Sequence, residues 1–312
     1  NGKTDASTND AFTQFWLGHL PFFARPGAKS VLVIGLGSGS TLAAAASHPI
    51  KKLDAVELEG AVVDAARLFK DLNRNVLEDS RLRLFQNDGR NFLLLRPDTY
   101  DVIISEPSNP WMAGVANLFS YEHYQTLQKR LNSGGVVCQW LHAYSMSTQD
   151  LQMIIRTFAR VFPNASLWTS YYPDLMLLGS EKPITFDMDQ MKEVYARPYV
   201  AQDLREYGLE TPEAIFANYW LGPKEIARLT QGGKTNTDNF PLLEFSAPRY
   251  LYAQTLLPNF KFLNYYRTQE LPPISGLEPP LEKNGKFYRD LVKAYIAKRF
   301  MREAQWALQR AS

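Results

Sequence analysis

Only one cysteine, Cys138, occurs in the 312 residues, and this excludes an internal disulfide framework. Histidine is also scarce, and the four positions are His19, His48, His123 and His142. Their separations do not match the spacing of zinc ligands, so we expect no metal site. No stretch approaches the roughly 18 consecutive apolar residues of a membrane-spanning helix. These absences favour a soluble domain and leave its cellular location undetermined.

An excess of charge of either sign is missing as well. The 34 Lys and Arg residues nearly balance the 32 Asp and Glu residues, and no dense basic stripe is present. Nucleic acid is therefore not an expected partner. The 45% of hydrophobic residues is ordinary for a globular protein, and the length suffices for one large domain or two smaller ones. Because the sequence starts at Asn1 rather than Met, we expect it to be part of a longer protein.

A glycine-rich turn is the most informative local feature. Residues 31–34 are wholly apolar and predict a strand that is buried on both faces. Gly35, Gly37 and Gly39 come next, and residues 41–46 are strong helix formers. Glycines at such a junction permit a tight turn and let a ligand lie against backbone N–H groups. Many glycine turns bind nothing, so this interpretation depends on residues farther along the chain.

Strands and helices are expected to alternate from residue 30 to about residue 180. This alternation predicts an α/β fold, a doubly wound parallel sheet with helices on both faces. The expected strands are 30–35, 52–58, 81–86, 100–105, 134–140, 166–171 and 175–179. The expected helices are 41–47, 60–72, 89–95, 120–131 and 147–161.

The last two of these strands cannot be joined by a parallel crossover. Only Tyr172, Pro173 and Asp174 separate them, and a parallel connection needs a dozen residues or more. We therefore expect an antiparallel hairpin at the end of the sheet. That arrangement is typical of the Rossmann-like class I fold of S-adenosylmethionine-dependent enzymes, and a dehydrogenase-type domain would lack it.

The regions on either side of residues 29–182 are expected to differ from this catalytic core. Residues 1–28 form an N-terminal lid region, in which Asp10–Gly18 is read as a helix or lid segment that stops near Pro21. Residues 183–270 form a helical insertion, with helices at 187–196, 199–207, 212–220 and 223–231 before 235–245 returns to the main domain. Residues 271–312 form a Pro-rich linker and a helix over 285–310 that is similar to one tetratricopeptide unit. Such a unit either packs on this domain or begins a helical repeat array.

Two acids lie at the ends of the second and third expected strands. Glu57 lies 22 residues after Gly35, where a carboxylate can accept hydrogen bonds from both hydroxyls of a ribose. Asp88, which precedes Gly89, is placed to accept a hydrogen bond from an adenine amino group. The alternative roles are a solvated strand end for Glu57 and a helix N-cap for Asp88.

The fourth strand delivers a further acid, Glu106, to the same edge of the sheet. An amine substrate arrives protonated, and a carboxylate within hydrogen-bond reach can remove that proton and attract the cation. The alternative is that Glu106 caps the turn that Pro107 and Pro110 impose. Trp111 follows, and burial near its ring would make Glu106 a better base. The small, apolar residues 112–118 are expected to form a lid.

Several stretches, in order along residues 1–250, resemble the spermidine synthase (polyamine aminopropyltransferase) family, especially its membrane-fused bacterial branch. They are residues 1–5, 18–21, 33–39, 56–58, 88–90, 104–110, 135–139 and 172–173. The resemblance implies an N-terminal β-hairpin region on a Rossmann-like domain, usually dimeric. It also implies transfer of an aminopropyl group from decarboxylated S-adenosylmethionine to a small amine such as putrescine, with release of methylthioadenosine. A membrane domain upstream of this chain would be expected from the branch.

The resemblance also implies the roles of individual residues. Glu57 would hold the ribose, Asp88 the adenine, and Glu106 would be the catalytic acid–base residue. The remaining donor-site residues would be Gly35, Gly37, Ser38, Gly39, Gly89 and Gln14. The acceptor side would consist of Asn109, Gln139, Tyr172 and Trp111.

Three positions depart from the family pattern. Ser38 stands where the family usually carries Asp, Glu106 is one methylene longer than the usual Asp, and Asn109 replaces a second acid. Losing two carboxylates weakens the case for a dicationic diamine, and Ser38 leaves room for the carboxylate of ordinary S-adenosylmethionine. Two alternatives therefore stay open: a methyltransferase that uses ordinary S-adenosylmethionine, and a non-catalytic nucleoside-binding module.

Overall fold

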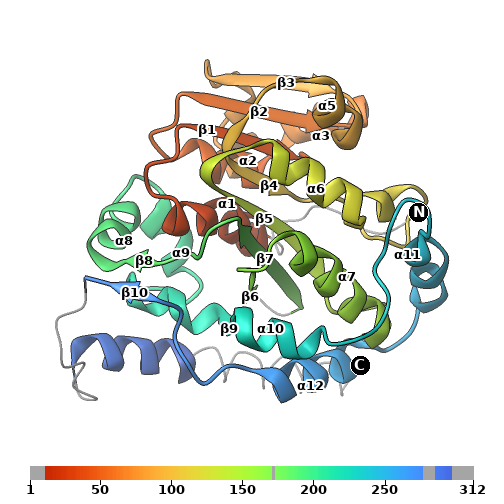
Figure 1. Cartoon of the computed structure of the whole chain (residues 1–312). Helices are drawn as coiled ribbons and strands as arrows, with labels where there is room; N and C mark the ends of the chain where they lie inside the picture. The colour runs from red at the N-terminus through yellow and green to blue at the C-terminus, as the bar shows by residue number, and fades with distance from the viewer. Residues whose placement is uncertain (1–10, 171–172, 277–284, 297–312) are drawn as a thin grey trace.

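A mixed sheet of eight strands, in the order β3-β2-β1-β4-β5-β7-β6-β9, forms the centre of the molecule (Figure 1). The structure is a computed structural model that describes residues 11–170, 173–276 and 285–296. The strands are β1 (Ser30–Ile34), β2 (Lys52–Glu57), β3 (Leu82–Gln86), β4 (Tyr100–Ser105), β5 (Leu131–His142), β6 (Ser166–Thr169), β7 (Asp174–Ser180) and β9 (Tyr219–Leu221). A small second sheet pairs β8 (Phe186–Asp187) with β10 (Ile274–Ser275).

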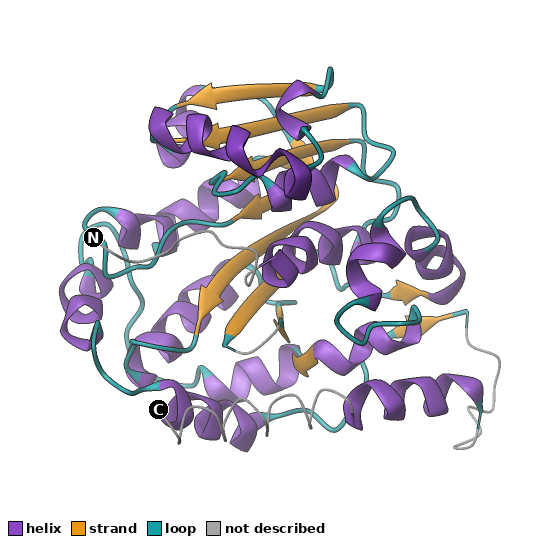
Figure 2. Cartoon of the chain, turned by 180° about the vertical axis from the view of Figure 1, so that it is seen from behind, coloured by secondary structure: helices purple, strands orange, loops and turns teal. Residues whose placement is uncertain are grey.

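Helices cover both faces of the sheet, as Figures 1 and 2 show from opposite sides. The first apolar cluster unites one sheet face with α1 (Ala11–Ala24), α2 (Ser40–Ala46), α3 (Gly60–Ala66), α8 (Met188–Tyr195) and α9 (Val200–Arg205). The second unites the other face with α5 (Gly89–Leu95), α6 (Tyr121–Lys129), α7 (Thr148–Val161), α10 (Pro223–Leu229), α11 (Leu242–Ser246) and α12 (Leu256–Tyr266). A short helix α4 (Lys70–Asn73) lies beyond α3 in the chain. Residues 286–296 are also helical.

The side chains of each strand point alternately to the two faces of the sheet, and this explains why helices pack on both faces. In β1, Val31 and Val33 belong to the first cluster, whereas Leu32 and Ile34 belong to the second. Successive side chains of a strand point to opposite faces, so a strand that is apolar at every position is buried on both. The core therefore lies on both sides of β1, β4 and β5, at the middle of the sheet.

The predicted α/β alternation and the terminal hairpin are confirmed. Strands β1 to β5 pair in parallel, β7 pairs antiparallel with β5, and β6 pairs antiparallel with β7. The predicted helix over 60–72 is interrupted, because α3 ends at Ala66 and a 3₁₀ turn precedes α4.

The β-hairpin expected within residues 1–28 is wrong for the part of this region that is described. Residues 11–24 form α1, and Pro21, expected to stop the helix, lies inside it. Almost the whole of α1 is buried, and a Cβ on Gly18 would lie 2.5 Å from the Ala44 Cβ of α2. Close helix–helix packing outweighs the hydrogen bond that Pro21 cannot donate. Residues 1–10 lie outside the described part.

The helix predicted over 212–220 is confirmed only in part. Glu213–Asn218 form a 3₁₀ helix, and Tyr219–Leu221 then extend as β9 beside β6. The residues Tyr-Trp-Leu favour a strand, and adding them covers the edge that β6 would otherwise expose. Part of the predicted linker, residues 277–283, and residues 297–310 of the last predicted helix lie outside the described residues.

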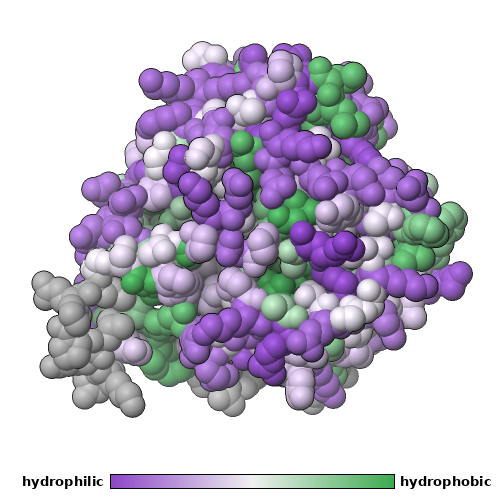
Figure 3. All heavy atoms as spheres, in the orientation of Figure 1, coloured by the Kyte–Doolittle hydropathy of each residue, from purple (hydrophilic) through white to green (hydrophobic). Residues whose placement is uncertain are grey.

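The described part of the chain contains no helix that is both long and apolar enough to cross a membrane. The face seen in Figure 3 is mainly hydrophilic, and its hydrophobic residues form separate groups.

Candidate functional site

The glycine turn lies at the carboxyl edge of the sheet, between the ends of β1, β2 and β4. Gly35, Gly37 and Gly39 all have positive φ values, of 91°, 52° and 84°. A Cβ on Gly35 would lie 2.2 Å from the backbone oxygen of Glu106, so a side chain there would collide with the end of β4. Both observations explain why this turn needs glycine. In a doubly wound sheet, ligands bind at this edge.

Glu57 is bonded directly to the glycine turn. Its Oε2 accepts a hydrogen bond from the Leu36 amide at 2.9 Å, and its Oε1 accepts one from the Glu59 amide at 3.0 Å. A carboxylate has about four acceptor positions, so capacity for ribose hydroxyls remains. Glu57 is thus positioned at the end of β2, where the sequence predicts a ribose contact.

Ser38 and Gln14 meet inside this turn. The Ser38 hydroxyl donates to Gln14 Oε1 at 2.6 Å and lies 2.7 Å from the Ser40 hydroxyl. The Thr41 hydroxyl also donates to the backbone oxygen of Gln14, at 3.1 Å. Ser38 and Gln14 are buried, at 0% and 5% exposure. Helix α1 therefore brings Gln14 onto the turn. Ser40 also belongs to this group, and the sequence analysis did not single it out.

Asp88 caps α5 at the end of β3. Its Oδ1 accepts a hydrogen bond from the Asn91 amide at 2.7 Å, so the alternative N-cap role is present. The next residue is Gly89, and a Cβ there would lie 2.5 Å from the Cγ2 of Ile34. The second acceptor oxygen of Asp88 leaves capacity for a ligand. A cap and a ligand contact are compatible roles for the one carboxylate.

Glu106 begins where β4 ends, directly against the glycine turn. Its amide donates to the backbone oxygen of Ile34 at 2.8 Å. Burial, with a smaller contribution from the charge of Glu106, raises the pKa of the Cys138 thiol. Cys138 itself belongs to the apolar cluster on the sheet face that α1 covers. The protonated, fully buried Cys138 is an inert core residue at neutral pH.

The loop after Glu106 folds over the end of β5. Trp111 packs edge-on against His142, with ring centroids 4.6 Å apart, and more distantly against Tyr144. The Asn109 amide donates to the Tyr144 hydroxyl at 3.3 Å. Gly114 donates its amide to Glu244 Oε1, so this loop is also anchored to α11. Asn109 and Trp111 are thus brought together, but as part of a packed loop.

Gln139 carries an unsatisfied oxygen at this edge. The residue is fully buried on β5, and its Nε2 donates to the backbone oxygen of Trp140 at 2.9 Å. Among the described residues, Oε1 has no hydrogen-bond donor. A buried acceptor without a donor costs about 1–3 kcal/mol, and a bound N–H or O–H group would remove that cost. Tyr172, the last predicted pocket residue, lies outside the described residues.

Sequence reasoning missed a polar group beside this edge, on α1, β5 and β7. The Thr13 hydroxyl donates to Asp174 Oδ2 at 3.0 Å and lies 2.7 Å from the Ser170 hydroxyl. The Trp140 indole N–H lies 3.3 Å from Asp174 Oδ1. The only signal for Asp174 is its place immediately after Tyr172 and Pro173. The sequence predicts a turn there, and nothing in the sequence links Asp174 to Thr13.

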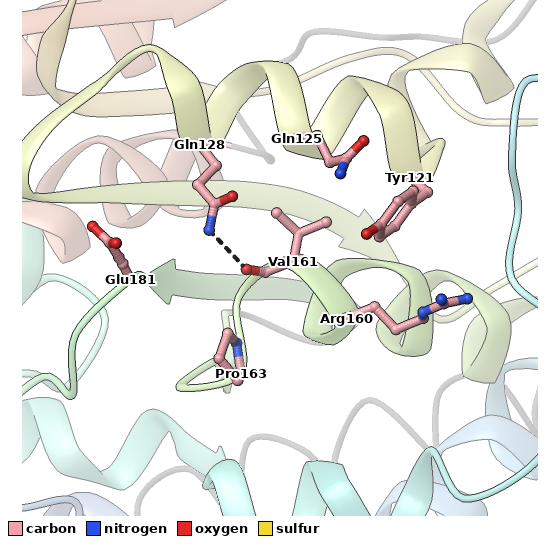
Figure 4. Close-up of a pocket in the computed structure, with 7 residues that line it drawn as sticks. All are labelled: Tyr121, Gln125, Gln128, Arg160, Val161, Pro163 and Glu181. Carbon is pink, nitrogen blue, oxygen red and sulfur yellow. Dashed lines mark hydrogen bonds between the residues drawn. The ribbon is translucent and has the colours of Figure 1, made fainter.

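Two hollows lie away from this edge. The one in Figure 4, of about 300 Å³, lies between α6 and α7, where the Gln128 amide donates to the Val161 oxygen at 3.1 Å. The other, of about 430 Å³, lies between α7 and α10. Neither is lined by any residue predicted to bind donor or acceptor. No group of three or more His, Cys, Asp or Glu side chains within the described ranges is placed to hold a metal ion.

The topology and the carboxyl-edge site together define a Rossmann-like class I fold, the fold of S-adenosylmethionine-dependent transferases. Residues 11–186 match the family model for the spermine/spermidine synthase domain. The chain belongs to this family.

Curated relatives are similar over part of this chain. Spermidine synthase of Dictyostelium discoideum is 33% identical over 149 residues, which are 46% of this chain and 52% of that protein. Polyamine aminopropyltransferase of Moorella thermoacetica is 29% identical over 200 residues, 61% and 70% of the two chains. Putrescine N-methyltransferase 2 of Nicotiana tabacum is 33% identical over 175 residues, 53% and 49%. The chain thus spans about half the length of two of these relatives.

Solved structures agree on the fold. Spermidine synthase from Thermotoga maritima superposes with a TM-score of 0.50 and 21% identity, over 82% of this chain and 75% of that one. A probable spermidine synthase from Corynebacterium glutamicum gives 0.52 and 16%, over 73% and 80%. At these identities the likeness establishes the fold alone.

Proposed function

We propose that this protein transfers an aminopropyl group from decarboxylated S-adenosylmethionine to a small amine and releases methylthioadenosine. The observation that carries this proposal is the position of Glu106. Its backbone is bonded to the end of β1 and lies against Gly35, so an acidic residue adjoins the turn at which the donor would bind. Family membership and the relatives named as polyamine aminopropyltransferases support the same reaction.

The donor would lie along the carboxyl edge from β3 to β4. Glu57 would accept hydrogen bonds from the ribose hydroxyls, and Asp88 one from the adenine amino group. The positive-φ glycines keep side chains away from the nucleoside. The buried oxygen of Gln139 would accept a hydrogen bond from the amine substrate. We propose that Asn109, Trp111 and Tyr172 also line the part of the site that binds this amine.

Glu106 would act as the base in this reaction. The amine nitrogen attacks the carbon of the aminopropyl chain that is bonded to the sulfonium. The C–N bond forms as the C–S bond breaks, and the electron pair of the broken bond stays on sulfur as methylthioadenosine leaves. Glu106 accepts the proton that the amine nitrogen loses. Positioning the two reactants side by side supplies much of the rate.

The test is release of methylthioadenosine from decarboxylated S-adenosylmethionine with a panel of amines, compared between wild type and Glu106→Gln. The variant keeps the size of the side chain and loses the base, so turnover should fall about 10²–10⁴-fold. Glu181→Gln, an exposed position at the hollow of Figure 4, is the matched control and should keep full activity. Equal turnover of Glu106→Gln and wild type would remove Glu106 from the reaction. No methylthioadenosine with any amine would overturn the proposed reaction.

Methyl transfer is the second candidate, and two observations favour it. A putrescine N-methyltransferase is among the relatives, and Ser38 occupies the place of an acid in the glycine turn. Ordinary S-adenosylmethionine carries a carboxylate that an acid at position 38 would repel. The released nucleoside separates the two reactions, since methyl transfer yields S-adenosylhomocysteine and aminopropyl transfer yields methylthioadenosine.

Two further proposals come from the family: that the protein forms a homodimer, and that a membrane domain precedes this chain in the full-length protein. Light scattering of the purified chain tests the homodimer. The sequence of the full gene product tests the membrane domain.

A further inference from the structure

The larger of the two hollows, of about 430 Å³, lies between α7 and α10 and is bordered by the loop over 230–235. The two helices lie side by side (Figure 1), and the Gln152 side-chain amide of α7 donates to the Leu229 backbone oxygen of α10 at 2.6 Å. Arg156 and Arg160 line this hollow, and no Asp or Glu of the described chain lines it. Two positive charges thus share the hollow without an acid in its wall.

Arg156 is a buried cation without a carboxylate partner in the described part of the chain. It is 8% exposed, and burial, with no opposing contribution from an acid, lowers the pKa of its guanidinium. Its Nε donates to the Thr230 backbone oxygen at 3.0 Å, and its Nη1 donates to the Lys234 backbone oxygen at 2.9 Å. These bonds stabilise the C-terminal end of α10, but a guanidinium has five N–H groups, so donors remain. Arginine is almost never buried unless its charge is paired.

Arg160 lies one turn farther along the same face of α7. Its Nη1 donates to the Thr235 hydroxyl at 3.2 Å, and its guanidinium lies 5.1 Å from the centre of the Tyr121 ring. Figure 4 shows this guanidinium directed away from Glu181, the acid that lines the neighbouring hollow. Like charges four residues apart on a helix repel each other, so an anion between Arg156 and Arg160 would relieve an unfavourable interaction.

The loop after α10 places glycine against Arg156. Gly232 and Gly233 line the hollow with positive φ values of 63° and 83°, and a Cβ on Gly233 would lie 2.7 Å from the Cζ of Arg156. Glycine therefore lets the backbone lie directly on the guanidinium. Within the described chain, the amides of Gly232 and Gly233 have no hydrogen-bond acceptor. Guanidinium groups and unpaired backbone amides that line one hollow are the donors that anions bind.

Much of the remaining wall is apolar and is formed by Pro163, Pro223, Ile226 and Ala227. Three of these four residues are exposed, so the hollow is open to solvent. Its volume lies within the range of about 300–1,000 Å³ that is usual for sites that bind small molecules. A matching ligand has an anionic group for the two arginines and an apolar body for this wall.

We propose that the hollow between α7 and α10 binds a small organic phosphate, a phosphate monoester with an apolar body. A phosphate monoester offers three acceptor oxygens and about two negative charges at neutral pH, so it can accept hydrogen bonds from both arginines and the loop amides together. A carboxylate offers fewer oxygens and a single charge. None of the residues assigned to the donor or the amine lines this hollow, so the inference goes beyond the proposed reaction and does not depend on it.

Calorimetric titration of phenyl phosphate into the full chain, in a phosphate-free buffer of low salt, tests this proposal. We expect saturable binding to wild type that is about 10–100-fold weaker in Arg160→Gln, because a charged hydrogen-bonding group is lost. Arg228→Gln is the matched control, since Arg228 is an exposed arginine of α10 that does not line the hollow. It should bind phenyl phosphate as wild type does. Benzoate should bind more weakly than phenyl phosphate, and phenol should not bind.

A second measurement needs no substitution. Phenylglyoxal modifies accessible arginines, and mass spectrometry identifies the modified positions. Saturating phenyl phosphate should slow the modification of Arg160 and leave that of Arg228 unchanged. Thermal unfolding shows whether Arg160→Gln folds, which we expect because Arg160 is exposed. If that variant fails to fold, protection of Arg160 in wild type decides.

The outcomes separate a phosphate site from general attraction of anions. Binding to wild type that weakens at least tenfold in Arg160→Gln alone, together with protection of Arg160, supports the proposal. Absence of saturable binding to wild type overturns it, as does equal weakening in Arg160→Gln and Arg228→Gln. Equal affinities for phenyl phosphate and benzoate, or for phenyl phosphate and phenol, would also overturn it, because the phosphate would then not be recognised.

Discussion

His123 is a buried histidine in the first turn of α6, and neither ring nitrogen has a partner among the described residues. Burial lowers its pKa from 6.5 to about 3, with a smaller contribution from the charge of Arg90. The folded protein therefore keeps His123 neutral at pH values at which the unfolded chain protonates it. The free energy of unfolding is therefore unaffected by this difference above pH 6.5 and decreases as the pH falls below 6.5, because only the unfolded chain takes up the proton.

Replacing His123 should flatten the dependence of stability on pH. Between pH 7.5 and pH 5, protonation of this one residue in the unfolded chain costs the wild type about 2 kcal/mol, and His123→Leu should remove that amount. The measurement is the free energy of unfolding by urea at both pH values. Tyr124→Phe is the control on the same helix, because burial raises the pKa of Tyr124 far above this range. An unchanged pH dependence in His123→Leu would contradict the assignment.

Ser38 shows that one residue of a recognisable motif can change which ligand the motif is expected to bind. Family membership is evident from the ordered motifs, yet the place of a typical acid is taken by a buried hydroxyl bonded to Gln14. The sequence predicts the location of the turn and the roles of Glu57 and Asp88 as edge residues. It could not predict the contact between Ser38 and Gln14, because it depends on how α1 packs against α2.

At the scale of elements, the turn between β1 and α2 depends on glycine for two separable reasons. Gly35 has a positive φ, and a side chain there would also strike the backbone of Glu106. Gly232 has a positive φ with open space around it, and a Cβ on Gly27 would meet nothing within 4 Å. The three positions thus separate backbone strain from steric collision.

We expect Gly35→Ala to be the most damaging of three substitutions. Gly27→Ala should change stability little, and Gly232→Ala should cost about 1 kcal/mol for the left-handed backbone alone. Gly35→Ala adds the collision, so it should cost clearly more and reduce methylthioadenosine release by moving Glu106. Urea unfolding and the transfer assay measure the two effects. If Gly35→Ala and Gly232→Ala lower the free energy of unfolding equally, the end of β4 must shift enough to accommodate the new methyl group, and the predicted collision would be wrong.

Element prediction succeeded where the signal was local. The strands from residue 30 to residue 180 carry their own apolar pattern, and the three residues between the predicted strands 166–171 and 175–179 leave room only for a hairpin. It failed for the end of α1, which was expected near Pro21, and for β9. Pro21 and the aromatic residues of α1 gave no local sign of a helix that continues to Ala24, and Tyr219–Leu221 became a strand only because β6 offers an edge.

At the scale of the whole molecule, buried polar contacts join α1 to segments far along the chain. His19 Nε2 lies 2.9 Å from Asp203 on α9, and its Nδ1 lies 3.0 Å from His48. Arg197 contacts His48 Nδ1 and can only donate, so His48 donates to His19 and His19 donates to Asp203. Arg74 completes the group with an ion pair to Asp203.

These contacts join residues up to 184 positions apart in the sequence, so no local sequence pattern predicts them. They connect the helical segment 187–205 with the helix that carries Gln14 to the glycine turn. The helical segment predicted as an insertion thus supports the helix that bounds the site. Such support could be found only from the folded structure.

The central claim is that the carboxyl edge around Gly35, Glu57 and Glu106 binds an S-adenosyl nucleoside. Calorimetric titration of decarboxylated S-adenosylmethionine, S-adenosylmethionine and methylthioadenosine into wild type and Glu57→Gln tests it most directly. Glutamine retains an oxygen for the Leu36 amide but loses the charge, and the exposed Glu78→Gln is the control. We predict saturable binding of methylthioadenosine to wild type, about 10–100-fold weaker in Glu57→Gln and unchanged in Glu78→Gln. No saturable binding of any of the three nucleosides to wild type, or equal affinities in wild type and Glu57→Gln, would contradict this claim.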